Sequence, residues 1–528
     1  MDSFRKFLKI TAYGFLILVL ALPAATAIDL DSLFIVSVGG QPAYERLSRM
    51  TSYHARGKVN INGLNGRFEE FYMPPNRFYL EVDFTHFRLV QAYDGITAWQ
   101  KDHNGFVSEM AGYEKNSFLS DLYFSAYAYL FPERLEGAFE YLGPTVKNGV
   151  TCHQVAFYPL GEDTVTVFFD MLTGTRRFVS GKLDNLVALT TVDDYRRIAE
   201  VLVPFHSRAE TQGQVLFTEF TLEEVKFDEP FNPKIFTRPE KATADFRFPA
   251  DKTQVLINFE YRNGHIYIKA AVNGKKTAWF LLDSGASGNT FNSGILKDLS
   301  LPEVGFLPAK GMGGFDKVKL VRSDSIVIGE LTLFNQVAGA LDLVGISQPG
   351  RDSLEFGGIL GYDLLSRFPV MINYKNSTIT VFNPDSFLPP DNGVVVPFHL
   401  SMQVPSIEAD LNGIPGRFII DLGNPFTLIL HSKFVKTNEL DKALTDIQEI
   451  TRDYGGIGGS VAGRTAVAET FVFAGIQLHS LTVVLPEESI GLSGSEEIAG
   501  NIGNMLLEKF ILLFDYARSR IIFYEPES

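Results

Sequence analysis

Hydrophobic and polar residues alternate in many short segments between residues 28 and 240. Examples are "GKVNING" (57–63), "RFYLEVDF" (77–84) and "TVTVFFD" (164–170), with turn sequences such as "PPN" and "YDG" between segments of this kind. A period of two residues places successive side chains on opposite faces of a strand. The pattern therefore predicts a β-rich domain over 28–240, built on one antiparallel sheet with a polar and an apolar face.

Few segments of this domain have the apolar spacing of a helix. Helices are expected around 43–49 and 118–130. After the domain, "RPEKATADFRFPADK" (238–252) is rich in charge and proline, which is typical of a connecting segment. We therefore expect a linker over 241–254.

From about residue 255 the chain carries an internal repeat. "IKAAVNGKKTAWFLLDSGASGNTF" (268–291) is matched by "IEADLNGIPGRFIIDLGNPFTLI" (407–429), each with an Asn-Gly turn, an apolar strand and Asp-x-Gly. Further on, "KGMGGFDKV" (310–318) is matched by "GGIGGSVAG" (455–463), and "GGILGYDLLSRFPVMINYKNSTITVFNP" (357–384) by "AGNIGNMLLEKFILLFDYARSRIIFYEP" (499–526). Three motifs in one order predict two copies of one lobe, over 255–393 and 394–528.

An acidic residue has the same place in both copies. Asp283 follows four apolar residues in "WFLLDSGAS" (279–287), and Asp421 follows "RFII". Asp, Ser and Gly suit an ordinary turn, so the turn alone leaves two interpretations: a polar turn, or a catalytic carboxylate held at the end of a buried strand. The duplication favours the second interpretation, because a two-fold arrangement of lobes would bring two such turns together.

Two neighbouring carboxylates have a chemistry that one carboxylate lacks. A single aspartate near its ordinary pKa of about 4 is a weak base toward water. Two carboxylates about 3 Å apart cannot both ionise, so they share one proton and titrate as a pair. One of them can then remove a proton from water, while the other donates a hydrogen bond to a scissile carbonyl.

Residues 255–528 resemble the aspartic peptidases, in particular bacterial retropepsin-like members with both lobes in one chain. The resemblance rests on the Asp-x-Gly turn after an apolar strand, on a glycine-rich hairpin, and on the apolar-apolar-Gly segment at 359–361, which 501–503 matches imperfectly. It implies a two-lobed β fold with a pseudo-two-fold repeat, catalytic Asp283 and Asp421, and neither a metal nor an organic cofactor.

The resemblance also implies roles for the residues around the aspartates. Ser284 and Gly285 in the first lobe, and Leu422 and Gly423 in the second, would support the two turns. The glycine-rich hairpins would be flaps that cover a polypeptide substrate, and their residues are Gly311, Met312, Gly313, Gly314, Gly456, Ile457, Gly458 and Gly459. Glycine clusters also occur in ordinary loops, so it is their place between the aspartate and the apolar-Gly segment that favours flaps.

The second lobe departs from the family pattern at Leu422, where Ser or Thr is expected. One half of an inter-lobe hydrogen-bond pair is then missing, and a partner hydroxyl left buried and unpaired would cost about 1–3 kcal/mol. Leu422 and Asn501 favour an alternative, a non-catalytic envelope protein that binds lipid or hydrophobic peptide on a degenerate peptidase scaffold. Because Asp421 and Gly423 remain, an aspartic endopeptidase is the function we expect.

Residues 45–238 resemble the outer-membrane lipoprotein-sorting family. The resemblance rests on "YDGITAWQKDHNG", "VTVFFDMLTGTRR", "VDDYRRIAEVLVPFHS" and "FDEPFNPKIFTRP". It implies a half-barrel, in which a curved sheet closes over helices around an apolar cavity, and a lipid or another hydrophobic ligand. The alternative is a β domain that only packs on the rest of the chain, since a fold does not fix a function.

Composition and charge restrict the partners. The 528 residues are 45% hydrophobic and include 45 Phe and 20 Tyr, as expected of a packed, β-rich chain of several domains, and we expect a monomer. The net charge of −15 disfavours nucleic acid and anionic membrane surfaces as partners. The nine histidines form no His-Glu-x-x-His segment, which disfavours a zinc hydrolase. Cys152 is the only cysteine, so its expected role is that of a small buried hydrophobe.

The first 27 residues have the form of a secretory signal peptide. Arg5, Lys6 and Lys9 precede the apolar run "ITAYGFLILVLALPAA", and small residues at 25–27 offer a cleavage site, so residues 1–27 would be removed. An uncleaved anchor is the alternative, but the apolar run is shorter than the roughly 20 residues of a spanning helix, and Pro23 interrupts it. We therefore expect a secreted or periplasmic protein.

Overall fold

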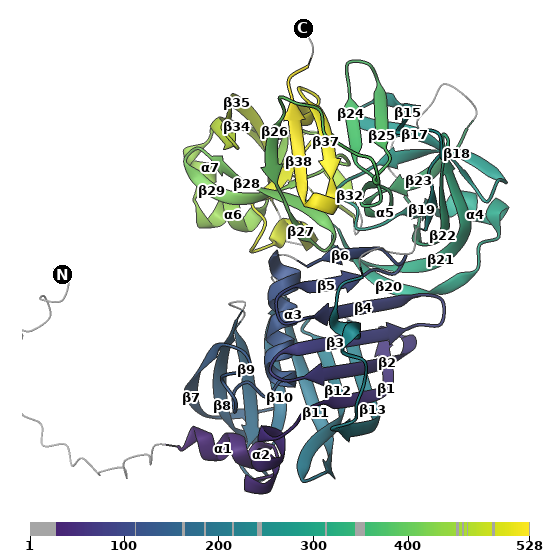
Figure 1. Ribbon diagram of the computed structural model, residues 1–528. Helices are drawn as coiled ribbons and strands as arrows, with labels where there is room; N and C mark the ends of the chain where they lie inside the picture. The colour runs from purple at the N-terminus through teal and green to yellow at the C-terminus, as the bar shows by residue number, and fades with distance from the viewer. Residues whose placement is uncertain are drawn as a thin grey trace, which may run out of the picture.

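The computed structural model describes residues 28–110, 112–160, 164–183, 186–213, 216–239, 245–311, 314–343, 354–449, 454–456, 459–461, 463–487 and 491–526. The predicted signal peptide lies outside these residues, as do four of the predicted flap residues, Met312, Gly313, Ile457 and Gly458. The protein is mainly β, which confirms the predicted fold class. Figure 1 shows a sheet domain, here called the lower domain, beneath a two-lobed unit.

The lower domain is built on one antiparallel sheet, which has thirteen strands over the described residues. Strands β1 to β6 run outward from the centre to one edge, and β7 to β13 return from the other edge to the centre, where β13 pairs with β1. The strands are β1 (Tyr53–Ile61), β2 (Leu64–Met73), β3 (Arg77–Asp83), β4 (Arg88–Tyr93), β5 (Ala98–Lys101), β6 (Val107–Glu109), β7 (Gly137–Lys147), β8 (Val150–Pro159), β9 (Val165–Asp170), β10 (Arg176–Leu183), β11 (Leu186–Ile198), β12 (Val201–Thr211) and β13 (Phe217–Phe227). In β1 the residues Ala55 and Val59 are buried and Arg56 and Lys58 are exposed, so the predicted alternation is confirmed there.

Short helices pack against this sheet: α1 (Leu30–Ser37), α2 (Gln41–Ser48) and α3 (Gly112–Ser125). The helices predicted around 43–49 and 118–130 are confirmed as α2 and α3, although both begin earlier than predicted. Helix α3 also ends before residue 130, because Tyr127 has a φ of 54°, which lies outside the helical region. The sequence did not predict α1, since its eight residues are too few and too apolar to show a helical period.

Aromatic side chains fill the space between these helices and the sheet. Phe34 of α1 is fully buried, and the centroid of its ring lies 5.6 Å from that of Phe157 and 5.7 Å from that of Phe169. Burying one such side chain stabilises a fold by about 1.5–3 kcal/mol. Cys152 is buried as well, which confirms its predicted role as a small hydrophobe.

The upper unit consists of two lobes with the same strand arrangement. In lobe 1, β17 (His265–Val272) pairs antiparallel with β18 (Lys276–Leu282), and β18 runs parallel to β23 (Phe356–Leu360). Strand β23 also pairs with β19 (Thr290–Asn292), which runs parallel to β22 (Leu331–Leu341). The end of β18 is therefore held in the middle of the lobe.

Lobe 2 repeats each of these pairings, so the predicted internal repeat is present in the strand topology. Strand β28 (Val404–Leu411) pairs with β29 (Ile414–Ile420), β29 runs parallel to β36 (Gly500–Ile502), β36 pairs with β30 (Leu428–Leu430), and β30 runs parallel to β35 (Ile476–Pro486). Further elements of the lobes are β16 (Glu260–Arg262), β20 (Glu303–Gly311), β21 (Gly314–Ile328), β27 (His399–Ser401), β31 (Thr445–Glu449), β32 (Tyr454–Gly456), β33 (Gly459–Val461), β34 (Gly463–Phe473), α4 (Ser293–Leu299), α5 (Tyr362–Leu365), α6 (Ser432–Thr437), α7 (Leu440–Ala443), α8 (Asn504–Leu507) and the 3₁₀ helices η2 (Gly491–Gly494) and η3 (Tyr516–Arg518). The 3₁₀ helix η1 (Pro233–Phe236) ends the lower domain.

A sheet shared by both lobes joins them at the top of the molecule (Figure 1). Its order is β15 (Gln254–Asn258), β25 (Thr378–Phe382), β24 (Val370–Asn373), β37 (Ile511–Asp515), β38 (Arg520–Tyr524) and β26 (Val394–Pro397). The first three strands come from lobe 1 and the last three from lobe 2, with β24 and β37 paired at the centre. The pseudo-two-fold axis of the repeat therefore passes between these two strands.

Part of the predicted linker over 241–254, residues 245–254, lies within the described chain and contributes to two sheets. Strand β14 (Phe246–Arg247) pairs with β22 of lobe 1, and β15 already begins at Gln254. The rings of Phe246 and Phe248 lie 4.7 and 6.0 Å from that of Phe368. Although the segment is rich in charged residues, Phe246 and Phe248 pack against the core of lobe 1.

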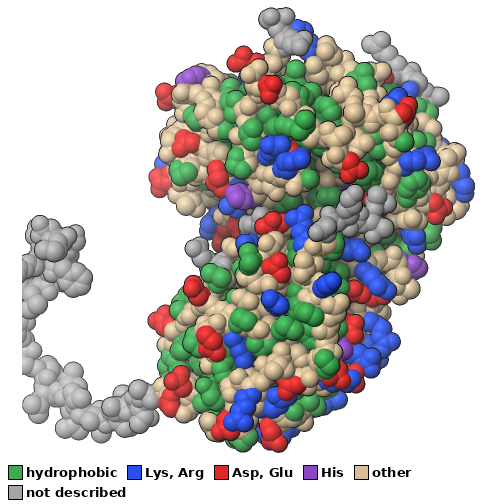
Figure 2. All heavy atoms as spheres, in the orientation of Figure 1, with side chains coloured by type: hydrophobic (Ala, Val, Ile, Leu, Met, Phe, Trp, Pro, Cys, Tyr) green, Lys and Arg blue, Asp and Glu red, His purple; other side chains and the backbone are tan. Residues whose placement is uncertain are grey.

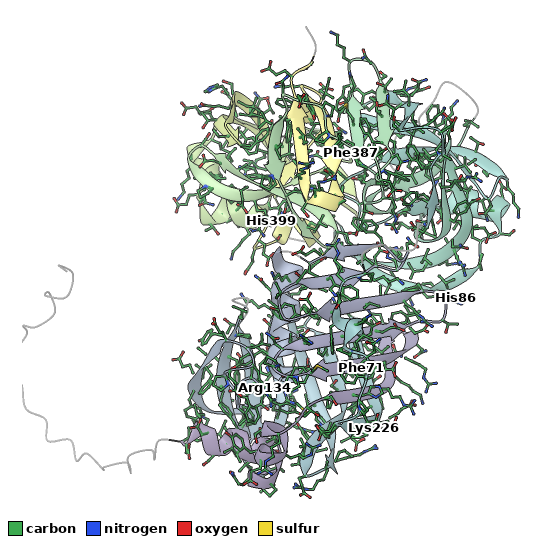
Figure 3. The ribbon with its side chains drawn as sticks, viewed as in Figure 1. Phe71, His86, Arg134, Lys226, Phe387 and His399 are labelled. Atoms are coloured by element: carbon green, nitrogen blue, oxygen red, sulfur yellow. The ribbon has the colours of Figure 1, made fainter. Side chains whose placement is uncertain are left out.

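The lower domain makes an apolar contact with lobe 1. Phe68 and Phe87 of the lower domain share a buried cluster with Val304 and Leu320 of the β20–β21 hairpin. Figure 3 shows His86, the neighbour of Phe87, at the edge of the lower domain beneath lobe 1. The hairpin that carries the first glycine-rich segment thus rests on the lower domain.

The lower domain also contacts lobe 2. Glu114 of α3 accepts hydrogen bonds from the backbone of Met402 and Gln403, in the turn after β27. His399, at the start of β27, lies at the lower edge of lobe 2 beside the lower domain (Figure 3). One domain therefore supports both lobes.

Arg367 is the centre of a buried group of charges between the lower domain and lobe 1. Its guanidinium lies 3.4 Å from a carboxylate oxygen of Asp102 in the lower domain, 2.9 Å from one of Asp245 and 3.8 Å from one of Asp363 in α5. Asn104 of the lower domain adds a hydrogen bond from its Nδ2 to Asp363 Oδ1 at 3.0 Å. These contacts join the turn between β5 and β6 to helix α5.

Acidic and basic side chains are mixed over the visible surface (Figure 2). The net charge of −15 therefore does not form a single acidic face in this view. In the parts of the chain that the structure describes, none of the helices has the length and apolar character that crossing a bilayer requires.

Replacing the central cation should destabilise the protein. Arg367→Met leaves three carboxyl groups facing one another without the guanidinium that they share, so we expect the free energy of unfolding to fall by about 3–5 kcal/mol in urea titrations. Arg417→Met, which removes a partly exposed ion pair with Glu408, is the control and should cost less than about 1 kcal/mol. Equal losses in the two variants would contradict a structural role for the buried group.

Candidate active site

Both predicted aspartates lie at the ends of buried strands. Strand β18 ends at Leu282, and the backbone N–H of the next residue, Asp283, donates to the carbonyl of Leu360 at 3.0 Å. Asp421 follows β29 in the same way, and its N–H donates to the carbonyl of Ile502 at 2.9 Å. Because Leu282 and Leu360 are fully buried, the apolar core fixes the position of the turn that follows.

The structure brings the two carboxyl groups together. Asp283 and Asp421 are joined by a side-chain hydrogen bond across the boundary between the lobes. Each also accepts a hydrogen bond within its own turn: the Gly285 N–H donates to Asp283 Oδ1 at 2.7 Å, and the Gly423 N–H donates to Asp421 Oδ1 at 2.9 Å. Backbone donors thus orient both carboxyl groups toward each other.

The glycines of the two turns leave room for this approach. A Cβ atom built at Gly285 would lie 2.5 Å from Asp421 Oδ1, and one built at Gly423 would lie 2.5 Å from the carboxyl carbon of Asp283. Both distances are far shorter than van der Waals contact, so a larger residue would force the carboxyl groups apart. The close pair therefore requires glycine at both positions.

Ser284 connects the two turns across the lobe boundary. Its hydroxyl donates to the carbonyl of Ile420 at 2.6 Å and accepts the backbone N–H of Leu422 at 3.0 Å. The hydroxyl is therefore paired on both sides, and the cost expected from Leu422, a buried unpaired partner hydroxyl, does not arise. Leu422 itself is fully buried in the apolar core.

Asn504 and His265 also cross the boundary, and the sequence did not predict either role. The Asn504 Nδ2 donates to the carbonyls of Gly264 and Leu422 at 2.8 and 2.5 Å. The His265 Nε2 donates to the carbonyl of Gly423 at 3.1 Å. Nothing in the sequence around His265 indicates this contact, whereas Asn504 had one available signal, its place directly after the apolar-Gly segment of the repeat.

Asn501 lies against Asp421. Its Nδ2 donates to Asp421 Oδ2 at 2.7 Å, and its Oδ1 lies 2.8 Å from the Nε2 of His431. The exposed fractions of Asn501 and His431 are only 3% and 0%. In the sequence, Asn501 differs from the apolar-apolar-Gly pattern of the first lobe. That polar residue at an apolar position was the one sequence feature that could have indicated its contact with Asp421.

Burial and the neighbouring carboxyl group change the pKa values of the pair. Loss of solvation raises the pKa of Asp283 well above the ordinary aspartate value, and the charge of Asp421 raises it further. Burial also raises the pKa of Asp421, but the hydrogen bond from Asn501 opposes this shift by favouring the charged form. The pair therefore retains a proton at pH values where an exposed aspartate has lost its own.

The predicted flap residues that the structure describes belong to two hairpins. Gly311 ends β20 and pairs with Gly314 at the start of β21. In lobe 2, Gly456 ends β32 and pairs with Gly459 at the start of β33. The repeat thus places a glycine-ended hairpin in each lobe.

The groups that contact the pair are backbone N–H groups, a side-chain amide and the carboxyl groups themselves. Among the described residues, no three or more His, Cys, Asp or Glu side chains gather as ligands of a metal ion would. The arrangement can hold a proton between two oxygens and exchange it with a molecule bound beside them.

Residues 268–364, from β17 into α5, match the family model described as aspartyl protease, and this stretch contains Asp283. No curated protein sequence matches the chain significantly.

Solved structures similar to parts of the chain include an aspartic proteinase from Irpex lacteus, with 11% identity over 52% of this chain and 98% of that one and a TM-score of 0.36. A DUF1329 family protein from Desulfovibrio piger has 11% identity over 39% of this chain and 95% of that one, with a TM-score of 0.28. An outer membrane lipoprotein-sorting protein domain from Vibrio parahaemolyticus has 14% identity over 37% and 94%, with a TM-score of 0.28.

The raised pKa of Asp283 predicts that stability falls as the pH rises. The unfolded chain releases this proton near pH 4, whereas the folded pair retains it, so the free energy of unfolding decreases from about pH 4 until the folded pair ionises. The decrease should be shallower in Asp283→Asn, as measured by urea unfolding at a series of pH values between about 4 and 7. Asp391→Asn, at an exposed aspartate, should keep the wild-type slope. Identical slopes in wild type and Asp283→Asn would refute the prediction.

Ser284→Ala should loosen the connection between the turns. It leaves the Leu422 N–H and the Ile420 carbonyl buried without their partner, so we expect a loss of about 1–3 kcal/mol in the free energy of unfolding. Ser386→Ala, at an exposed serine, is the control and should change stability by less than about 0.5 kcal/mol. A Ser284→Ala variant as stable as the control would show that the hydroxyl does not hold the lobes together.

Proposed function

We propose that the chain is an aspartic endopeptidase, which hydrolyses peptide bonds with a water molecule activated between Asp283 and Asp421. The observation that carries the proposal is the hydrogen bond between two partly buried carboxyl groups that come from duplicated turns. Carboxyl groups held in this way share one proton, which gives the site an acid and a base at the same time. The match of residues 268–364 to aspartyl proteases supports the same function.

In the proposed reaction, the ionised carboxylate removes a proton from water as the water oxygen attacks the carbonyl carbon of the substrate. The protonated carboxyl group donates its proton to the carbonyl oxygen, so a neutral tetrahedral diol forms and the pair still holds one proton. Proton transfer to the amide nitrogen and cleavage of the carbon–nitrogen bond then release an amine and a carboxylic acid. The rigid strands that carry both aspartates supply the orientation that such a step requires.

The substrate we propose is an extended polypeptide. Gly311 and Gly314 in lobe 1, and Gly456 and Gly459 in lobe 2, end hairpins whose backbone could add hydrogen bonds to an extended chain. Main-chain pairing of this kind makes few demands on substrate side chains. The hairpins are thus proposed to act as flaps.

We further propose that the enzyme acts outside the cytoplasm, secreted or in a periplasm, and that the lower domain binds a hydrophobic ligand such as a lipid. The form of residues 1–27 supports the first proposal. The sequence motifs in residues 45–238 that resemble the outer-membrane lipoprotein-sorting family support the second.

The test of the proposed function is cleavage of a mixed peptide pool by the chain from Ile28 onward, between about pH 3 and 7. We expect activity at acid pH, and a loss of about 10²–10⁴-fold in kcat/KM for both Asp283→Asn and Asp421→Asn, because each removes a group that transfers a proton. Asp391→Asn, at an exposed position, should keep wild-type activity.

Absence of cleavage by the wild type at every pH, combined with binding of a hydrophobic ligand, would favour the non-catalytic envelope protein. Activity that survives in Asp421→Asn but is lost in Asp283→Asn would reject a pair formed within one chain.

A further inference from the structure

The residue next to Asp421 breaks the two-fold symmetry of the pair. In lobe 1 the place of Asn501 is taken by Ile359, since each pairs in a parallel ladder with the residue two positions before its aspartate. Ile359 lies in an apolar cluster and has no polar side-chain atom to donate. Asp421 thus has an amide donor at the position where Asp283 has a hydrocarbon.

The orientation of the Asn501 amide follows from its partners. The Nδ2 of Asn501 faces Asp421 Oδ2 at 2.7 Å, and an amide nitrogen can only donate. The Oδ1 on the other side then accepts from the Nε2 of His431 at 2.8 Å, which requires a hydrogen on that nitrogen. The backbone carbonyl of Asn501 accepts from Asn424 Nδ2 at 3.0 Å, so the residue is held from three sides.

We propose that Asn501, oriented by His431, is a positioning residue that keeps the negative charge of the pair on Asp421 and the shared proton on Asp283. The inference rests on the proposed function and deepens it. Asp421 is then the base that removes the proton from water, and Asp283 is the acid that donates to the substrate carbonyl. Because only Asp421 has this side-chain donor, the state with the charge on Asp421 and the proton on Asp283 has a lower free energy than the reverse state.

Other titratable groups face the pair from neighbouring elements. His265 faces Asp421 from the start of β17, and Tyr516 of η3 faces Asp283. Burial lowers the pKa of His265 and raises the pKa of Tyr516 well above its ordinary value, so burial favours the neutral form of both. Two backbone N–H groups act on each carboxyl group, those of Gly285 and Gly423 on Asp283 and those of Gly423 and Asn424 on Asp421. Among the described groups, the side-chain amide of Asn501 is the donor at Asp421 that has no counterpart at Asp283.

The test is the pH profile of kcat/KM for peptide cleavage by Asn501→Leu, which keeps the size of the side chain and removes the donor. The charged form of Asp421 then lacks the hydrogen bond that stabilised it, so Asp421 ionises less readily. The acidic limb of the profile should therefore move to higher pH by about 1–2 pH units. His431→Phe should move the limb in the same direction, because Asn501 loses the group that orients it. His431→Gln retains an N–H donor and should restore a limb close to that of the wild type.

Val483→Ala, which opens a cavity in the core of lobe 2 and removes no polar group, controls for general loss of stability and should leave the limb unchanged. If Asn501→Leu does not fold, Asn501→Ser takes its place, since its hydroxyl is too short to reach Asp421. An acidic limb within about 0.3 pH units of the wild type in a folded, active Asn501 variant would overturn the inference and leave the peptidase proposal intact. A wild type that cleaves nothing would overturn both.

Discussion

A hydrogen bond between two partly buried carboxyl groups is the constraint around which the two-lobed unit is built. Two such acids are stable side by side only when they keep a proton, and only when the surrounding structure prevents them from moving apart. The parallel pairing of β18 with β23 and of β29 with β36 fixes the two strand ends. Glycine at 285 and 423 permits the approach, and the Ser284 hydroxyl connects the turns across the boundary. Each of these features serves one oxygen–oxygen contact.

The scaffold is symmetric, whereas the site is not. Each lobe contributes three strands to the shared sheet in equivalent order from its edge, and both lobes repeat one set of strand pairings. The departures from symmetry gather at the pair: Leu422 in place of a second hydroxyl, Asn501 in place of an isoleucine, and contacts from His265 and Asn504 that join the lobes. Duplication supplies the geometry, and the unequal residues give two chemically identical acids different surroundings.

The sequence predicts those parts of the fold that depend on neighbours along the chain. Alternation in segments such as 57–63 identifies strands, and a repeated motif order identifies two lobes and both aspartates. It does not predict contacts between distant residues, such as Asn501 with His431, because nothing local specifies the partner. Asp245 is an example. It lies in a segment rich in proline and charge, which is typical of a solvated linker, yet it forms an ion pair with Arg367, more than a hundred residues later. The sequence alone does not distinguish a charged residue that will be buried from one that will stay exposed.

The group around Arg367 has a consequence for how the chain is made. Asp102 and Asn104 leave the ribosome more than 250 residues before Asp363 and Arg367, so the lower domain can be complete before lobe 1 acquires its α5 helix. Lobe 1 can then fold against a lower domain in which Asp102, a partner of Arg367, is already in place. A fragment that begins at lobe 1 would lose Asp102, one of the carboxylates beside Arg367, and would expose the apolar residues that pack on the lower domain. The whole chain, and not its carboxyl-terminal half, is therefore the natural unit of folding.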